Sequence, residues 1–165
     1  MLALSFCGRL PRQAEKTPSH ASWPPAPAAA PLPDSAFRVE WQHVYVPSTM
    51  AAGKTVTVEV AFKNTSTDTW PDPQHANFGK RDGSYAVRLS YRWWKSGAAR
   101  PVADDEERTD LTAPVLPRQS ATLLVNVTAP REPGDYLLQF DLVQELVTWF
   151  EWKGAARKTV PIRVS

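Results

Sequence analysis

Residues 87–93 read Val-Arg-Leu-Ser-Tyr-Arg-Trp, an alternation of apolar and polar side chains with a period of two. This is the period of a β-strand that buries one face, because successive side chains of a strand point to opposite sides. The apolar phase carries Trp93 inward, so the following residue, Trp94, points to the opposite face. The stretch therefore predicts a half-buried strand with one tryptophan in a core and its neighbour partly exposed.

The same alternation recurs along the chain, in residues 55–63, 122–128 and 159–164. Residues 37–45 and 136–143 add two strands, and residues 147–152 are either a further short strand or a wide turn. Glycine-containing turns separate these segments, and no window has a helical period. The pattern predicts an all-β fold, a two-sheet immunoglobulin-like sandwich of about seven strands. Tyr136, which opens a strand just after Pro133-Gly134, favours the tyrosine corner of such sandwiches.

Two segments divide the chain: an N-terminal linker over residues 1–36 and the sandwich domain over residues 37–165. The linker combines an apolar start with a Pro/Ala-rich stretch, which predicts disorder. Leu4-Ser5-Phe6-Cys7-Gly8 resembles a bacterial lipobox, with Phe6 where Gly or Ala is usual; a misplaced start codon or a simple tail are the alternatives. No apolar run is long enough to span a bilayer. Membrane attachment is thus expected only through a lipid anchor at Cys7, and the expected location is the cell envelope or the exterior, with the cytoplasm left open.

Composition argues against several classes of function. The formal net charge is +2, from 19 basic and 17 acidic residues that are spread along the chain, so no nucleic-acid partner is expected. The one cysteine lies in the linker, and an internal disulfide is therefore impossible. The sequence holds three histidines, no nucleophile elbow and no phosphate-binding glycine loop. We expect no enzyme activity, no cofactor and no metal site.

The sequence contains two acidic groupings. Asp104-Asp105-Glu106-Glu107 lacks the alternating spacing of a calcium loop and is interpreted as a solvated turn. Asp141 with Glu145 could imitate the carboxylate pair of a glycosidase. A structural or binding role is much commoner for carboxylates at a strand end.

The order of motifs resembles a known family of modules. Lys63-Asn64-Thr65 is followed by Thr69-Trp70, and Pro133-Gly134-Asp135-Tyr136 is followed by Asp141-Leu142-Val143-Gln144-Glu145 and Trp149-Phe150. These residues resemble a bacterial Ig-like module that is similar to the four-tryptophan central domain of selective-autophagy cargo receptors. The resemblance implies a binding or scaffolding β-sandwich. Arg118 and Leu146 depart from it, since each stands where the family usually has glycine.

The aromatic residues carry the prediction of a site. Six tryptophans lie in the domain: Trp41, Trp70, Trp93, Trp94, Trp149 and Trp152. Trp70 is expected to plug one end of the sandwich rather than to hold a ligand. The candidate ligand-binding residues are the outward tryptophans and two polar neighbours: Trp94, Trp152, Gln144 and Glu145. Exposed rings with polar neighbours suit either a protein partner or a cell-surface glycan. The competing hypothesis is a protein-interaction or spacer domain that presents its strand edges, with the tryptophans covered.

Overall fold

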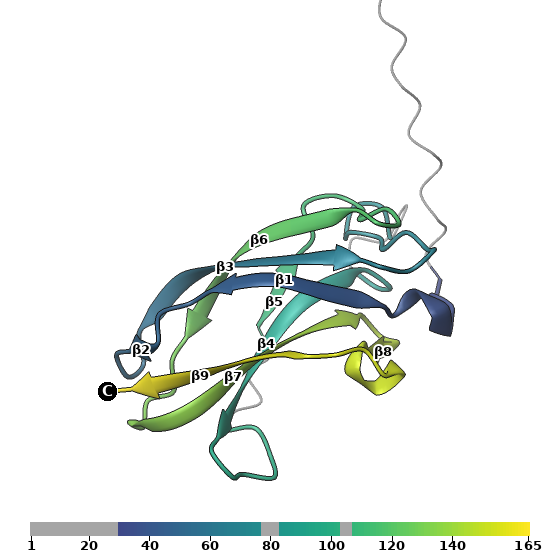
Figure 1. Ribbon diagram of the computed structural model, residues 1–165. Coiled ribbons are helices and arrows are strands. Elements are labelled where there is room, and N and C mark those ends of the chain that lie inside the picture. The colour runs from purple at the N-terminus through teal and green to yellow at the C-terminus, as the bar shows by residue number, and fades with distance from the viewer. Residues whose placement is uncertain (1–29, 77–82, 103–106) are drawn as a thin grey trace, which may run out of the picture.

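The computed structural model describes residues 30–76, 83–102 and 107–165. They form two β-sheets that face each other across one hydrophobic core (Figure 1). Sheet A has the strand order β1-β3-β6, formed by β1 (Val39–Tyr45), β3 (Thr55–Asn64) and β6 (Ser120–Thr128). Both pairings in sheet A are antiparallel.

Sheet B has six strands in the order β2-β9-β7-β4-β5, with β8 paired to β7. Its members are β2 (Thr49–Met50), β4 (Val87–Lys95), β5 (Arg108–Asp110), β7 (Gly134–Gln144), β8 (Thr148–Trp149) and β9 (Lys158–Val164). Two 3-10 turns, η1 (Asp34–Ala36) and η2 (Glu151–Lys153), are the helical elements of the described residues. The all-β, two-sheet immunoglobulin-like sandwich is confirmed. The structure adds β2 and β5, two very short strands that the sequence did not indicate.

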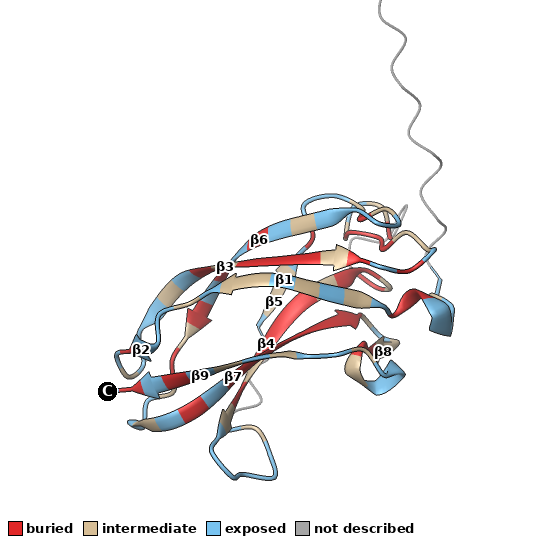
Figure 2. Ribbon diagram, in the orientation of Figure 1, coloured by how far each residue is buried: buried red, intermediate tan, exposed pale blue. Residues whose placement is uncertain are grey.

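The alternating segments form strands as expected. The facing sides of the two sheets carry the hydrophobic core, and in β6 these buried residues alternate with exposed ones on the outer side (Figure 2). Val58, Val60 and Phe62 of β3 point into the core, as do Leu123, Val125 and Val127 of β6. Residues 147–152, for which a strand and a turn were both open, contain both β8 and η2.

Aromatic side chains fill much of the core. Trp93 is buried and meets Tyr136 edge-on, with ring centroids 6.0 Å apart. The Tyr136 hydroxyl donates a hydrogen bond of 2.8 Å to the Glu132 carbonyl oxygen, which is the expected tyrosine corner. Trp70 is fully buried between Phe62 and Phe150, which confirms that it plugs the sandwich.

The chain enters the sandwich earlier than the predicted boundary at residue 37. Ala36 is fully buried, and its carbonyl oxygen accepts a hydrogen bond of 2.8 Å from the Trp70 indole. Leu32 N–H donates to the Gln144 side chain, whose amide in turn donates to the Ala30 carbonyl oxygen. Residues 30–36 are therefore not a free linker but part of the packed domain. Cys7 and most of the Pro/Ala-rich segment lie outside the described residues, as does Asp104-Asp105-Glu106.

The first strand of the sandwich is divided between the two sheets. β1 pairs antiparallel with β3 in sheet A, and after Val46-Pro47-Ser48 the chain crosses to sheet B, where β2 pairs parallel with β9. Arg163 N–H donates to the Ser48 carbonyl oxygen, and Ser165 N–H donates to that of Met50. The last strand is thus attached directly to the first part of the domain.

Candidate functional site

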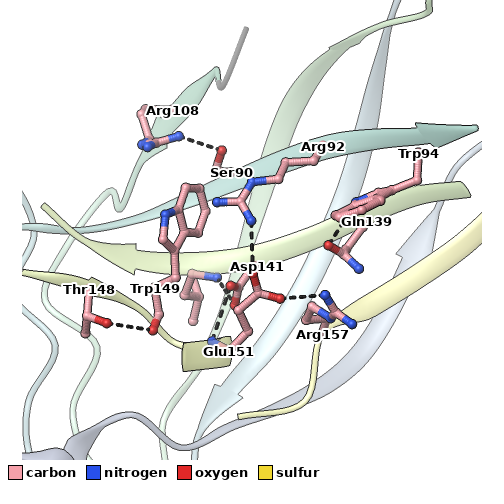
Figure 3. A network of polar contacts seen from close by, with 11 residues as sticks. Ser90, Arg92, Trp94, Arg108, Gln139, Asp141, Thr148, Trp149, Glu151 and Arg157 are labelled. Atoms are coloured by element: carbon pink, nitrogen blue, oxygen red, sulfur yellow. Dashed lines mark hydrogen bonds and ion pairs between the residues drawn. The ribbon is translucent and has the colours of Figure 1, made fainter. Parts of the chain in front are cut away.

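The outer face of sheet B carries a row of polar side chains contributed by two neighbouring strands. The register sets Ser90 of β4 opposite Asp141 of β7, and Arg92 opposite Gln139. Trp94 follows on the same face, opposite Leu137. Figure 3 shows these side chains converging with Trp149 of β8, Glu151 of η2 and Arg157 of the loop before β9.

Trp149 lies over this face between two guanidinium groups. The Arg92 guanidinium is 3.5 Å from the ring centroid of Trp149, and that of Arg108 is 4.6 Å from it. Stacked cations of this kind stabilise an aromatic ring through its quadrupole. Trp149 is buried, so the arrangement fixes the β8 segment onto the sheet and does not leave a ring open to a ligand.

The charges on this face are paired. Glu151 accepts hydrogen bonds from Arg92 at 3.0 Å and from Arg157 at 2.7 Å (Figure 3). Glu145 accepts from Arg108 Nε at 3.0 Å. These carboxylates are largely covered. Their geometry therefore indicates that the charges serve to hold the face together.

Asp141 is a buried carboxyl at the centre of the network. Its Oδ1 accepts from the Leu142 N–H at 2.8 Å, and its Oδ2 accepts from the Glu151 N–H at 3.3 Å. Burial raises the pKa of Asp141 to about 7, and the Glu151 charge adds to this, whereas the two N–H donors and Arg92 act in the opposite direction. Asp141 and Glu145 therefore have separate partners: backbone amides for the first and arginines for the second.

The structure does not bring the four predicted site residues onto one surface. Trp94 is half-buried, and its indole N–H donates to the Gln139 side chain at 3.1 Å. Trp152 is 67% exposed. Gln144 is fully buried, where its amide donates to the Tyr85 and Ala30 carbonyl oxygens. Gln144 points inward because it shares the strand phase of Leu138 and Leu142, so it is not accessible to a ligand, contrary to the prediction.

Trp152 remains accessible at the rim of the sandwich. It lines an open depression of about 420 Å³ together with Glu151, Gly154, Ala155 and Arg157. Glu145, the fourth predicted residue, is not part of this lining. A flat ring with a carboxylate and a guanidinium beside it is chemically suited to a polar ligand that has apolar faces.

A second accessible feature was missed from the sequence: the free edge of β6. The Asn64 N–H donates to the Gln119 carbonyl oxygen, and the Ala129 N–H donates to that of Lys54, both at 2.9 Å. Hydrogen-bonding residues alternate along an antiparallel ladder. The odd-numbered residues of β6 therefore direct their backbone N–H and C=O groups toward β3. The even-numbered residues direct their backbone N–H and C=O groups away from the sheet, where β6 has no neighbouring strand in the described structure.

One end of this edge is closed by side chains from sheet B. The Thr128 N–H donates to the Tyr91 hydroxyl oxygen at 3.0 Å, and the Trp93 indole donates to the Thr128 carbonyl oxygen at 2.8 Å. No such partner occurs within the described residues for the outward backbone groups of Ser120, Thr122, Leu124 and Asn126. The open part of the edge therefore runs from residue 120 to residue 126.

The edge also lacks the usual protection against pairing. Natural edge strands commonly carry charged residues, especially lysine, or proline. β6 reads Ser-Ala-Thr-Leu-Leu-Val-Asn-Val-Thr, without a charge or a proline, and Leu124 is 69% exposed on its outer side. The lack of charge over nine residues therefore leaves this edge able to pair with another strand, but it does not mark β6 as an edge in the sequence.

Other kinds of site find little support in the described residues. They contain no group of three or more His, Cys, Asp or Glu side chains arranged to hold a metal ion. Nor does any helix in that part of the chain have the length and apolar character needed to cross a membrane.

Comparison with known proteins gives structural neighbours of low sequence identity. No family model matches the chain, and no curated protein matches it. One neighbour is the CARDB domain of the PF1109 protein from Pyrococcus furiosus, with 15% identity, a TM-score of 0.43, and coverage of 78% of this chain and 86% of that one. Another is the alkylpurine DNA glycosylase AlkC of Pseudomonas fluorescens, with 10% identity, a TM-score of 0.45, and coverage of 77% of this chain and 30% of that one.

A β-glucosidase from Erythrobacter marinus matches with 11% identity and a TM-score of 0.43, over 77% of this chain and 15% of the enzyme. The sheets and the tyrosine corner described above define the class of protein: an immunoglobulin-like β-sandwich module. The resemblance to the four-tryptophan domain of cargo receptors stays a prediction.

Proposed function

We propose that this chain is a non-catalytic binding module that acts through protein interaction, and that its β6 edge accepts an extended strand of the partner. The observation that carries the proposal is the row of outward backbone groups on Ser120, Thr122, Leu124 and Asn126. An added strand gains main-chain hydrogen bonds from such a row, as in other complexes formed by β-strand addition.

The position beside β6 is one that a further strand fills in related folds. Constant-type immunoglobulin domains have a fourth strand next to the one that corresponds to β6. Here sheet A ends at β6, and the short β5 pairs with β4 in sheet B instead. A partner strand would thus complete sheet A.

The outer face of sheet B is less suited to binding a partner than the β6 edge. Its arginines are engaged with Glu145, Glu151 and the Trp149 ring. A ligand on that face would have to displace ion pairs that fix β8. We therefore assign a structural role to the outer face of sheet B and the binding role to the β6 edge.

The test uses a synthetic peptide of residues 119–129 and hydrogen exchange of the backbone amides. We expect the amides of Thr122, Leu124 and Asn126 to exchange fast in the dilute protein and to become protected when the peptide is added. Leu124→Pro removes one outward N–H and should abolish the protection, whereas the matched control Leu124→Thr keeps it. Unchanged exchange at saturating peptide would refute strand addition at this edge.

A glycan ligand is the second candidate, and the exposure of Trp152 beside Glu151 and Arg157 favours it. Cell-wall or capsular polysaccharides should then change the intrinsic tryptophan fluorescence. Trp152→Ala should remove the response, and Trp94→Ala, at a half-buried indole that is already hydrogen-bonded, should retain it. A panel of polysaccharides that leaves the spectrum unchanged would exclude this candidate. Attachment to the cell envelope is also part of the proposal, and it rests on the lipobox-like sequence Leu4-Ser5-Phe6-Cys7-Gly8.

A further inference from the structure

The outward backbone groups of β6 have no hydrogen-bond partner in the described structure from residue 120 to residue 126, whereas those of Thr128 are bonded. From this pattern we infer that the partner strand is β6 of a second copy of this chain, paired antiparallel about a two-fold axis at Leu123. The inference rests on the proposed function, because it uses the same edge. It names the occupant and the register.

The open groups are self-complementary in this register. Residues whose numbers are symmetric about 123 face each other, so Thr122 faces Leu124 of the other copy and Ser120 faces Asn126 of the other copy. Each facing pair of outward residues exchanges two hydrogen bonds. The four pairs together give about eight bonds. Every outward N–H and C=O from residue 120 to residue 126 then has a partner in both copies.

The cap on Thr128 selects this register over its neighbour. A shift of the axis to Leu124 would set Ser120 against Thr128 of the other copy. The Thr128 backbone groups are already bonded to Tyr91 and Trp93. That register would therefore leave the backbone groups of Ser120 without partners, and the bonds to Thr128 disfavour it for this reason.

The side chains permit the same arrangement. The outward side chains that would meet across the axis are Ser, Thr, Leu and Asn, so no like charges face each other. The inward residues Leu123 and Val125 are already buried in the core, and a second β6 would extend the inner layer at its margin. The two copies of sheet A would join into one sheet with the order β1-β3-β6-β6-β3-β1.

The first experiment is sedimentation equilibrium of the full chain over a range of micromolar to millimolar concentrations. We expect a monomer–dimer equilibrium that Leu124→Thr preserves. Leu124→Pro removes an outward donor, and Leu124→Lys places two ammonium groups beside the axis; each should weaken the dimer at least about tenfold. Leu124 is exposed, so the lysine variant keeps the fold should the proline variant fail to do so.

A second experiment tests which edge of sheet A forms the contact. In a Cys7→Ser background, Leu124→Cys should form a covalent dimer with a short bifunctional thiol reagent, because diagonal neighbours across a strand pair lie about 7–8 Å apart. Tyr45→Cys is the matched control: it is exposed as well, but lies on β1 at the opposite edge of sheet A. Cross-linking at residue 45 in place of 124 would overturn the inference.

The two proposals can fail separately. A chain that stays monomeric at every concentration overturns the inference. If the 119–129 peptide still protects the β6 amides, strand addition survives and the partner is another protein. If the peptide also has no effect, both proposals fall.

Discussion

The indole N–H of Trp93 reaches across the sandwich and donates a hydrogen bond of 2.8 Å to the carbonyl oxygen of Thr128. Trp93 belongs to β4 in sheet B, and Thr128 ends β6 in sheet A. One side chain therefore packs in the core, joins the two sheets and closes one end of the open edge. The neighbouring Trp94 points to the other face and has none of these roles.

The first prediction concerns this difference between neighbours. Trp93→Ala should lower the free energy of unfolding by about 3–5 kcal/mol, the range for large buried aromatics, because it empties part of the core and leaves the Thr128 carbonyl unpaired. Trp94→Ala should cost much less, since the ring is half-buried and loses one bond to Gln139. Urea titration of both variants measures the costs. Equal losses would mean that Trp94 packs as tightly as Trp93.

The second prediction concerns two residues in left-handed backbone conformations. Arg118 has φ = 65° and Leu146 has φ = 62°, a region that costs a non-glycine residue roughly 1–2 kcal/mol. Arg118→Gly and Leu146→Gly should each stabilise the domain by about 0.5–1 kcal/mol, after the entropy that glycine adds to the unfolded chain. Leu146 is 82% exposed, so its side chain contributes little packing. Leu146→Ala is the control and should bring no gain in thermal stability.

The third prediction is a pH dependence. Asp141 has a pKa of about 7 in the folded protein, above its value near 3.9 in an unfolded chain. The folded state thus binds more protons than the unfolded state between these values, so this carboxyl lowers stability as the pH rises from about 4 to about 7. Asp141→Asn should remove that contribution.

Denaturant titrations of the parent and of Asp141→Asn at pH 5 and pH 8 would measure this effect. The parent should lose more stability than the variant between the two values, by an amount on the order of 2–3 kcal/mol. The variant also loses free energy of unfolding by an amount that does not change with pH, because its amide nitrogen cannot accept an N–H bond from Leu142 or Glu151. Parallel losses in both proteins would assign the pH dependence to other groups.

The fourth prediction concerns the segment that precedes β1. A chain that begins after residue 36 should be less stable than one that begins after residue 29, by about 1–3 kcal/mol, because Trp70 and Gln144 lose their partners on residues 30–36. Differential scanning calorimetry of the two truncations measures the difference. Gln144→Ala in the longer chain should lose a similar amount, and identical melting temperatures would show that the segment contributes nothing.

The strands could be predicted from the sequence because their signal is local. Val58, Val60 and Phe62 repeat with the period of a strand, and the inward phase of Trp93 follows from the residues just before it. The same rule could have placed Gln144 inward, since it continues the phase of Leu138, Phe140 and Leu142, but a polar side chain at the end of a strand resembles a ligand contact. Only its hydrogen-bond partners, the backbone groups of Leu32, Tyr85 and Ala30, show why an amide is needed there.

The candidate site was harder to predict because it depends on contacts between distant residues. Whether Trp94 is covered depends on Gln139 and on Pro101, which forms a bridge with it. Trp149 is buried because Arg92 and Arg108, far away in the chain, lie over it. The open edge of β6 follows from the absence of a neighbouring strand, and no local pattern records which strands will be neighbours.

The parallel pairing of β2 with β9 has a mechanical consequence. β2 lies in the first part of the domain, β9 is its last strand, and the two run in the same direction, so a force that pulls the ends of the domain apart acts along both strands. The bonds from Arg163 to Ser48, from Ser165 to Met50 and from Ala52 to Ser165 would then be loaded together in shear rather than broken one by one. A module tethered on both sides would resist extension at this seam, together with the antiparallel β1–β3 pairing that precedes it in the chain.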